Sequence, residues 1–474
     1  MTGPSLFTNE VAMPRLVVIG GGISGASMFY HMRMNYPEWE VILLERGSEV
    51  GGINRNIEVE GLRFSLGSRY IFGLNPFTVD TVLELAGSDC KLGQSLHSVF
   101  YKGRFLDFPV QMNTSGLSLR ERVECLWGLF RRSNKKDVWS FEDWAIAKFG
   151  EPIARKFILS HVTKCWKVDP GEIDFTGSAK KVMEPNARGM FWGGVRRPKP
   201  FANNEFLYPV GGIGTIVNEM IARAKSGNNI QKAWAIDRTN FMVYAVDMSE
   251  RKVVSTEGEE VEYDALVSTI PMPGLVNLIH NSNIGVPQDV VLAGEKLRFN
   301  CMASVMLAFE GDILNGREEH FIYVPEKRYR FSRVSIPRNF DPSSCPDGHT
   351  SLLVEISFGK EQKKLLFRED YQRELAVKIV RDVEALFPCE CGLGRKLKGF
   401  AVGVIDPSYI ITDENYHPAR NKVIEYLRQN DIHMLGRFGK WDWSRIEDTI
   451  PESHDLSHRI GGKPWLAMMA TGSS

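Results

Sequence analysis

Three glycines at short intervals follow an apolar run near the N-terminus of the chain. The run Leu16–Ile19 leads into Gly20, Gly22 and Gly25, and a helical pattern continues from the last of them. The first glycine would allow a tight turn, the second would let the backbone approach a pyrophosphate, and the third would let the helix pack on the strand. The helix N-terminus would then offer free N–H groups and a positive dipole end to phosphate. The predicted phosphate-contacting residues are Gly20, Gly22, Ile23, Ser24 and Gly25.

A carboxylate stands at the end of the next apolar run. Glu45 follows Val41–Leu44 and lies twenty residues after Gly25. At this interval an acidic side chain would accept hydrogen bonds from the hydroxyls of an adenosine ribose. The strand, the glycine turn, the helix and the acid together predict a dinucleotide-binding site, with a glycine-rich turn that holds no ligand as the alternative.

The residues beyond Glu45 favour FAD over NAD as the dinucleotide. A nicotinamide-binding domain would normally continue into further compact βα units, whereas here Gly51 and Gly52 precede a hairpin-like alternation over residues 56–64. Glycines at these positions permit the backbone to run close to a long, extended cofactor. The further cofactor contacts predicted from this segment are Arg46, Gly51, Gly52 and Asn54.

The overall composition limits the partners that we expect the chain to bind. Its 474 residues carry 58 Lys and Arg against 58 Asp and Glu, so the formal net charge is zero and neither nucleic acid nor an acidic membrane is expected as a partner. No apolar run is long enough to span a bilayer. Seven cysteines, an odd number scattered along the chain, indicate reduced thiols and a cytoplasmic location. The histidines form no metal-binding motif and the pair Cys389 and Cys391 stands alone, so no metal site is expected.

Blocks spread along nearly the whole chain resemble motifs of one flavoprotein superfamily. Besides the N-terminal glycines, these blocks are Phe100–Gln111, Phe141–Val168, Phe321–Val334 and Gly436–Trp441. They are similar to segments of the FAD-dependent amine-oxidase superfamily, in particular of UDP-galactopyranose mutases and bacterial protoporphyrinogen-oxidase-like proteins. The resemblance implies FAD as the cofactor. It also implies that Arg333 stands where an arginine of eukaryotic mutases reaches the substrate diphosphate, and that Gly436 and Arg437 belong to a C-terminal flavin motif.

Two departures from the superfamily pattern concern the expected active site. The family usually carries a Gly-Gly-His or Gly-Pro-His turn beneath the flavin, where this chain has Gly67, Ser68 and Arg69. A permanent cation there would favour an anionic reduced flavin, but it could not change its protonation as histidine does. The mutases also carry a tyrosine where this chain has Trp443, so a hydroxyl that would bind a phosphate is lost. These departures weigh against the specific mutase reaction and leave FAD binding untouched.

The C-terminal motif also predicts contacts to the middle of the cofactor. The strand before Gly436 leads into a turn and then a helical pattern, which would bring a second helix N-terminus to the ribityl-pyrophosphate region. Glu447 and Asp448, near that helix start, would bind ribityl hydroxyls or, equally, complement the helix dipole as surface acids.

The pattern of elements predicts an α/β fold, in which a Rossmann-like FAD-binding domain of the GR2 type is interleaved with a mixed-sheet substrate domain and a helical insertion. The expected units are residues 14–75, 205–295 and 425–465 for the discontinuous FAD-binding domain, residues 76–204 for a helical and substrate-domain insertion, and residues 296–424 for the substrate-binding domain. Within the insertion, helical spacing predicts a helix over residues 119–130, and Ser140 is the predicted N-cap of another.

Several arginines and aromatic residues are candidates for contact with a substrate. Arginines bind phosphates and carboxylates bidentately, so several that converge would imply an anionic substrate such as a nucleotide sugar. The candidate catalytic and substrate-contacting residues are Arg69, Arg333, Tyr409, Tyr416, Arg437, Trp441 and Trp443, with Arg104 and Arg330 as weaker candidates.

We expect an FAD-dependent oxidoreductase that transfers hydride from a polar, glycosyl or nucleotide-linked small molecule to flavin N5. One alternative is a UDP-galactopyranose-mutase-like isomerase that uses reduced FAD without net redox change. The other is a flavin-binding protein without catalytic activity. A homodimer is compatible with the sequence.

Overall fold

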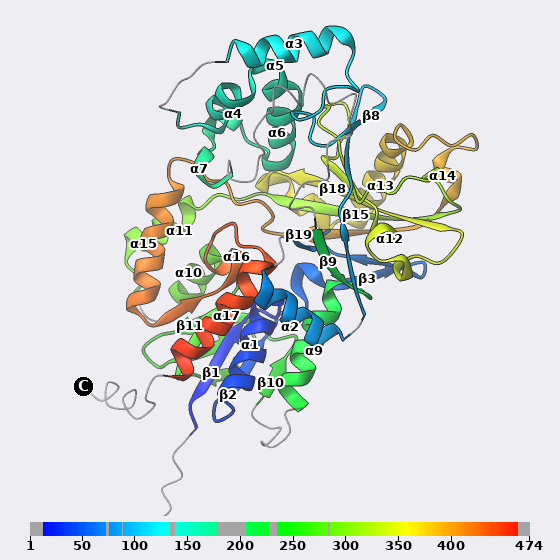
Figure 1. The fold of residues 1–474 in the computed structure, drawn as a ribbon. Coiled ribbons are helices and arrows are strands. Elements are labelled where there is room, and N and C mark those ends of the chain that lie inside the picture. The colour runs from blue at the N-terminus through cyan, green and yellow to red at the C-terminus, as the bar shows by residue number, and fades with distance from the viewer. Residues whose placement is uncertain are drawn as a thin grey trace, which may run out of the picture.

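The computed structural model describes residues 13–72, 75–87, 89–132, 138–178, 205–226, 235–282 and 285–462. A five-stranded parallel sheet lies in the lower half of the molecule, in the order β10-β2-β1-β14-β20 (Figure 1). Its strands are β1 (Arg15–Ile19), β2 (Glu40–Leu44), β10 (Ala235–Arg238), β14 (Ala265–Ser268) and β20 (Ile432–Met434). Three distant parts of the sequence therefore meet in one sheet, which confirms the predicted Rossmann-like α/β class.

The strands of this sheet are apolar on both faces, and each face has its own cover. Val18 and Leu43 belong to one hydrophobic core, whereas their neighbours Val17 and Ile42 belong to another. Successive side chains of a strand point to opposite faces, so a continuous apolar run is typical of a parallel sheet that is covered on both sides. One face is covered by α1 (Ile23–Asn35), α2 (Pro76–Ala86), α9 (Ile213–Ser226) and α17 (Ile446–Gly461). The other is covered by α10 (Met272–His280), α11 (Gln288–Lys296), α15 (Tyr416–Gln429) and the antiparallel strands β11 (Val243–Asp247), β12 (Lys252–Ser255) and β13 (Glu260–Glu262).

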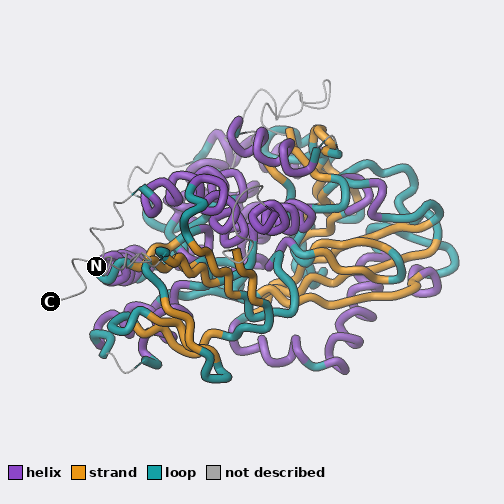
Figure 2. Tube along the Cα trace, turned by 90° about the horizontal axis from the view of Figure 1, so that it is seen from below, coloured by secondary structure: helices purple, strands orange, loops and turns teal. Residues whose placement is uncertain are grey.

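A seven-stranded mixed sheet forms the second large layer, in the order β19-β15-β18-β17-β16-β7-β8. Figure 2 shows its long strands extending to the right, away from the parallel sheet. Its strands are β7 (His97–Tyr101), β8 (Arg104–Asp107), β15 (Cys301–Glu310), β16 (Phe321–Tyr323), β17 (Arg333–Ser335), β18 (His349–Phe358) and β19 (Leu397–Ile405). Neighbours are antiparallel except β16 and β7, which are parallel. Helix α13 (Glu369–Glu384) packs on one face of this sheet through Ile379 and Val383.

Residues 90–107 form strands inside the unit of residues 76–204, which the sequence predicts to be a helical and substrate-domain insertion. The first strand, β6 (Cys90–Gln94), pairs with β9 (Glu205–Pro209), which also pairs with β5 (Ile71–Phe72). The next two strands, β7 and β8, join the mixed sheet through a two-residue turn at Lys102 and Gly103, whose φ angles are 49° and 75°. Two consecutive residues with positive φ are the geometry of a tight hairpin turn. A similar hairpin joins β3 (Asn56–Val59) and β4 (Leu62–Ser65).

The predicted helices of the insertion are present and cluster at the top of Figure 1. The cluster comprises α3 (Leu119–Phe130), α4 (Phe141–Phe149), α5 (Glu151–Ile153), the π-helical η2 (Ala154–Leu159), α6 (Ser160–Trp166), η3 (Pro170–Glu172) and α7 (Phe175–Ser178). Ser140 caps α4 as predicted, because its side chain accepts a hydrogen bond from the Asp143 N–H. Residues 179–204, the rest of the expected insertion, lie outside the described residues. The remaining elements are η1 (Gly52–Asn54), α12 (Pro337–Phe340), η6 (Pro342–Ser344), η7 (Lys360–Phe367), α14 (Leu393–Lys396) and α16 (Gly436–Gly439).

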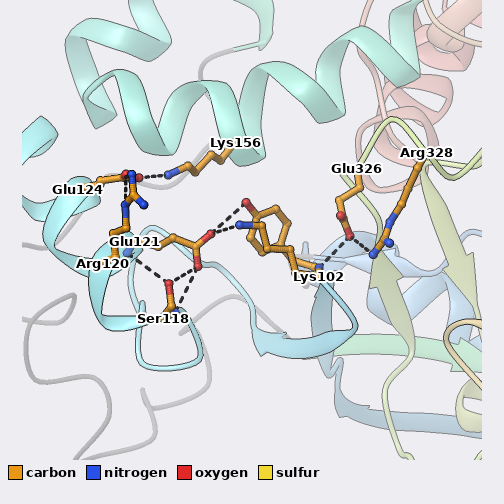
Figure 3. A network of polar contacts seen from close by, with 9 residues as sticks. Lys102, Ser118, Arg120, Glu121, Glu124, Lys156, Glu326 and Arg328 are labelled. Atoms are coloured by element: carbon orange, nitrogen blue, oxygen red, sulfur yellow. Dashed lines mark hydrogen bonds and ion pairs between the residues drawn. The ribbon is translucent and has the colours of Figure 1, made fainter.

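A polar network joins the helical cluster to the edge of the mixed sheet (Figure 3). Lys102 Nζ donates to Glu121 Oε1 at 2.6 Å, and Ser118 Oγ donates to Glu121 Oε2 at 2.7 Å. The Lys102 contact lowers the pKa of the Glu121 carboxyl to about 2. On the other side of the turn, the Lys102 N–H donates to Glu326 at 2.8 Å.

Among the described residues, every helix is too short or too polar to cross a membrane.

Candidate active site

The first glycine turn connects β1 to α1 and leaves no room for side chains at two positions. Gly20 has φ 104°, and a Cβ atom there would lie 2.4 Å from Thr269 Oγ1. A Cβ atom at Gly25 would lie 1.8 Å from the Gly20 carbonyl oxygen, so the helix can pack on the turn only with glycine at that position. Gly22 is the N-cap of α1 and provides no capping side chain. The first N–H groups of the helix are therefore available to a phosphate.

The glycine pair after β2 lies directly against this turn. Gly51 donates its N–H to the Gly21 carbonyl at 2.8 Å, and Gly51 and Gly22 form an isolated parallel bridge. A Cβ atom at Gly52 would lie 3.1 Å from the Gly22 Cα atom. Beyond η1, the Gly67 N–H donates to the Ile53 carbonyl at 3.0 Å. The segment that carries Ser68 and Arg69 is thereby tied to the glycine pair.

The C-terminal motif also reaches the first glycine turn. Gly436 has φ 74°, and a Cβ atom there would lie 2.1 Å from Ser24 Oγ. A Cβ atom at Gly439 would lie 2.5 Å from the Ser268 carbonyl oxygen at the end of β14. The predicted proximity of these two turns, which are more than four hundred residues apart, is confirmed by these contacts.

Glu45 is held in place beside the glycine turn by two backbone donors. The Gly21 N–H donates to Oε2 and the Gly47 N–H to Oε1, both at 2.7 Å. Each carboxylate oxygen has a further lone pair, so the side chain can still accept hydrogen bonds from a ribose. Arg46 is exposed, whereas Asn54 is buried and its Oδ1 atom has no hydrogen-bond partner in the described part of the chain. These features fit a long dinucleotide. The free N–H groups of α1 and the closely packed glycines leave space for its phosphates, and Glu45 and the unpaired Asn54 oxygen could accept hydrogen bonds from its hydroxyl groups.

The two acids at the start of α17 have different environments. Glu447 is buried, accepts the Phe72 N–H at 2.6 Å and so joins α17 to β5. Burial raises the pKa of the Glu447 carboxyl to about 7. Asp448 is exposed and accepts the Arg445 N–H at 2.9 Å, as the third helical residue of a capping box. Of the two expectations for Asp448, this contact supports the role of a helix-capping surface acid.

Three arginines that the sequence singled out form one cluster: Arg333 and Arg69 interact with the buried carboxylate of Glu355, and Arg437 interacts with Arg69. Arg333 Nε and Nη2 donate to the two oxygens of Glu355 at 2.7 and 2.8 Å, and Glu355 is 1% exposed. Burial opposes the charge of Arg333, but Glu355 and Tyr323 raise its pKa well above the ordinary value. The guanidinium of Arg333 also lies 4.5 Å from the centre of the Phe321 ring.

Arg69 and Arg437 make no ion pair among the described residues. Arg69 Nη1 donates to the Ser68 carbonyl at 3.0 Å, and Arg437 Nη2 to the Ser408 carbonyl at 3.3 Å, while Arg437 Nε is buried without a partner. Burial, together with repulsion by Arg69, lowers the pKa of Arg437 to about 10. Burial also lowers the pKa of Arg69, and Arg333 contributes to the decrease. The cluster therefore carries more positive than negative charge, and an anion would relieve the repulsion.

Aromatic side chains line the cluster next to Arg437. The guanidinium of Arg437 lies 4.4 Å from the centre of the Trp443 ring. Trp166 lies 4.7 Å from Tyr409 and 5.6 Å from Trp443, measured between ring centres. Trp166 Nε1 donates to the Ile410 carbonyl at 3.2 Å, which orients the indole. Trp166 is not among the candidates from the sequence, although its position in the Phe141–Val168 block was a usable indication.

Two histidines and a tyrosine extend the cluster toward the mixed sheet. The ring of Tyr323 lies 5.4 Å from that of His161 and 5.8 Å from that of His97. Burial, together with Arg333, lowers the pKa of both histidines to about 3, so both rings are neutral at physiological pH. His97 and Glu355 stand outside the sequence motifs, which explains why sequence reasoning missed them. His161 and Tyr323 lie inside the blocks Phe141–Val168 and Phe321–Val334, and their position there was a usable indication.

The expectations for four further candidates from the sequence are corrected: Trp441, Arg104 and Arg330 lie away from the arginine cluster, and Tyr416 interacts with it only electrostatically, through Arg437. Trp441 is completely buried. It belongs to the core between the parallel sheet and helices α10, α11 and α15, where its ring centre lies 5.7 Å from that of Phe299. Tyr416 is buried in the same core and donates its hydroxyl to the Trp441 carbonyl at 2.6 Å. Arg104 is exposed on β8, and Arg330 is exposed and pairs with Asp382 at 2.8 Å.

Comparison with known proteins agrees with this architecture. A family model for flavin containing amine oxidoreductases matches residues 23–408. The structure of a reduced UDP-galactopyranose mutase aligns over 97% of this chain and 98% of its own, with 21% identity and a TM-score of 0.81. A putative protoporphyrinogen oxidase from Exiguobacterium sp. 255-15 aligns over 95% and 99%, with 17% identity and a TM-score of 0.70. A putrescine oxidase with redesigned cofactor binding aligns over 95% and 100%, with 12% identity and a TM-score of 0.62.

The three solved structures share the fold with this chain, and the family model covers most of its length. The chain therefore belongs to the flavin containing amine oxidoreductases, enzymes whose cofactor is FAD.

Proposed function

We propose that the protein oxidises a polar, anionic small molecule, glycosyl or nucleotide-linked, by hydride transfer to FAD. The charge of the arginine cluster is the observation that carries this proposal. Arg333 is paired with Glu355, whereas within the described part of the chain Arg69 and Arg437 donate hydrogen bonds to carbonyl oxygens and form no ion pair. Cations that are largely removed from water are costly unless an anion accompanies them. A phosphate or carboxylate on the substrate would provide that anion.

The cofactor would be held by the converging glycine segments. The N–H groups at the start of α1 would bind the pyrophosphate, and Glu45 would bind the adenosine ribose. The closeness of Gly52 to Gly22, and of Gly436 to Ser24, supports this placement because side chains there would fill the space beside the turn. When bound, FAD supplies the hydride-accepting ring.

The substrate would be bound by the side chains around Arg333. Glu355 uses two of the five N–H groups of Arg333 and fixes the plane of the guanidinium, so the remaining donors are oriented before a ligand arrives. Tyr409, Trp443 and Trp166 would stack on a sugar or a base and exclude water from it.

A redox-neutral isomerase of the UDP-galactopyranose mutase type is the second candidate. The near-complete alignment with the reduced mutase, at a TM-score of 0.81, favours it. Two residues weigh against it: Arg69 stands where the superfamily usually has histidine, and Trp443 stands where the mutases have tyrosine.

Anaerobic spectroscopy of the holoenzyme with candidate nucleotide sugars separates the two functions. Bleaching of the oxidised flavin when substrate is added supports hydride transfer. Product that forms only after reduction with dithionite, without net consumption of electrons, supports the isomerase and contradicts our first choice. If nucleotide sugars neither bind nor perturb the flavin spectrum, the proposed substrate class is wrong.

We also propose the division of the chain into functional units. Residues 14–75, 205–295 and 425–465 would form the cofactor unit, with residues 76–204 and 296–424 as the units that contribute to the substrate site. The five strands of the parallel sheet all fall in the first set, which supports the proposal. Residues 463–465 lie outside the described residues.

The odd number of scattered cysteines supports a cytoplasmic location.

A further inference from the structure

Helix α3 has an apolar outer face as well as an apolar inner face. On the inner side Cys125 and Leu129 are buried in the core of the helical cluster. On the outer side the exposed fractions are 76% for Leu119, 58% for Val123, 60% for Trp127 and 75% for Phe130. These four residues are spaced by four, four and three positions, so they form one stripe along the helix. We call this stripe the outer face of α3, and Figure 1 shows the helix at the outermost end of the molecule.

The charges beside the outer face of α3 are predominantly positive. Arg120, Arg131 and Arg132 are exposed, and Arg122 is half-buried. The guanidinium of Arg131 lies 5.2 Å from the centre of the Trp127 ring, so it borders the stripe directly. Of the two acids of the helix, Glu121 pairs with Lys102, and Glu124 pairs with Lys156 and also with Arg120, whose charge it partly balances. The zero net charge of the whole chain therefore conceals a local basic and apolar surface, which composition alone could not reveal.

This combination favours an anionic lipid surface over a second copy of the chain. If two copies packed α3 against α3 in antiparallel fashion, Arg131 and Arg132 of one would approach Arg120 and Arg122 of the other, and like charges would repel. A helix with Trp, Phe and Leu on one face and arginines along its flanks is instead suited to lie in the interface of a bilayer. The apolar side chains enter the boundary of the acyl chains while the arginines reach the phosphates.

We propose that α3 is a membrane-surface docking helix that binds anionic bilayers through Leu119, Val123, Trp127 and Phe130. The helix does not cross the bilayer: it lies in the plane of the interface, and the exposed Arg131 and Arg132 beside its C-terminal end contribute the preference for acidic lipid. Docking would hold the helical cluster, which supplies His161 and Trp166 to the candidate active site, next to the bilayer.

Flotation of the purified full-length holoenzyme with vesicles tests this proposal. The enzyme should float with vesicles of phosphatidylcholine and phosphatidylserine, and much less with phosphatidylcholine alone. The double variant Trp127→Gln/Phe130→Gln should lower the partition coefficient by about tenfold or more. The double variant Arg131→Glu/Arg132→Glu should abolish the preference for phosphatidylserine and its sensitivity to salt.

Matched controls keep the test specific to this face. Phe367→Gln/Val377→Gln removes apolar side chains that are 61% and 51% exposed elsewhere on the molecule, and it should leave flotation unchanged. All variants change exposed residues, and far-UV circular dichroism checks that each is folded. Failure of the wild-type enzyme to float, or equal flotation of the control and the Trp127→Gln/Phe130→Gln variant, would overturn the proposal. A wild-type dimer that this variant converts to a monomer, without vesicle binding, would show instead that the outer face of α3 joins two copies.

Discussion

Arg333 and Glu355 stand directly opposite each other on the antiparallel strands β17 and β18, and their side chains form two hydrogen bonds of 2.7 and 2.8 Å. The cross-strand register places the two side chains on the same face of the sheet at close range. The strand pairing thus decides the orientation of Arg333 before any substrate binds.

Breaking this pair on one side should destabilise the protein strongly. Glu355→Gln leaves the Arg333 cation without a carboxylate in a site where Glu355 is 1% exposed, and we expect a loss of about 3–5 kcal/mol in the free energy of unfolding. The double variant Arg333→Met/Glu355→Gln removes both charges and should recover part of that loss. Urea unfolding of the holoenzyme measures both values. A single variant as stable as the wild type would show that the pair is solvated.

Removing the charge of Arg69 should weaken the binding of anions. Arg69→Gln takes away one of the two cations that make no ion pair among the described residues, and we expect the affinity for UDP to fall by about tenfold or more, with a weaker dependence on salt. Arg69→Lys keeps the charge and should retain part of the affinity. Flavin spectral perturbation during a UDP titration measures the change.

The matched control for Arg69 is Arg330→Gln. Arg330 is exposed and pairs with Asp382, so its removal should leave UDP affinity unchanged. Equal losses in the two variants would mean that the effect of Arg69 is a general effect of net charge, and the arginine cluster would then lose its assigned role.

The cofactor half of the molecule could be predicted because its determinants are local in sequence. Gly20 and Gly25 and the acid at Glu45 follow from one strand, one turn and the next strand, and steric limits on a Cβ atom leave few alternatives there. The C-terminal turn at Gly436 was predicted from its resemblance to the superfamily's flavin motif, and it lies against the first glycine turn as expected.

The substrate half could not be assembled in the same way. Glu355, Tyr323 and Trp166 come from β18, β16 and α6, and they meet only because distant strands pair. Trp441 and Trp443 are two residues apart in one motif, yet the first enters the core and the second borders Arg437. A motif indicates that a segment lies near a site; the path of the backbone decides which of its side chains reaches it.

Substitution of Gly436 by alanine should weaken the binding of FAD. In Gly436→Ala the new Cβ atom would lie 2.1 Å from Ser24 Oγ, and the residue would have to hold φ near 74°. Steric overlap and backbone strain together should cost more than about 3 kcal/mol, and we expect a lower ratio of flavin to protein absorbance after purification.

Gly61 offers a matched control for this substitution. It has φ 75° but no atom within 4 Å of the position of a Cβ, so Gly61→Ala isolates the cost of the backbone conformation, about 1 kcal/mol. Its flavin content should equal that of the wild type. If Gly436→Ala also keeps its full flavin content, the C-terminal turn does not take part in cofactor binding.

Glu447 should make stability depend on pH on the alkaline side. Burial raises the pKa of its carboxyl to about 7, so the folded protein binds a proton that the unfolded chain releases at lower pH. This stabilisation is fully present below the ordinary pKa of about 4.5 and is lost as pH rises through 7.

The variant Glu447→Gln keeps the acceptor for the Phe72 N–H without the charge. Its free energy of unfolding at pH 8 should therefore exceed that of the wild type by up to about 3 kcal/mol, with little difference at pH 4.5. Asp448→Asn is the neighbouring control: its carboxylate is exposed and caps α17, so this change should bring no gain at pH 8. Thermal unfolding of the holoenzyme at the two pH values measures the pattern, and a Glu447→Gln variant without an alkaline gain would mean that the carboxyl is ionised and stabilised in the folded state.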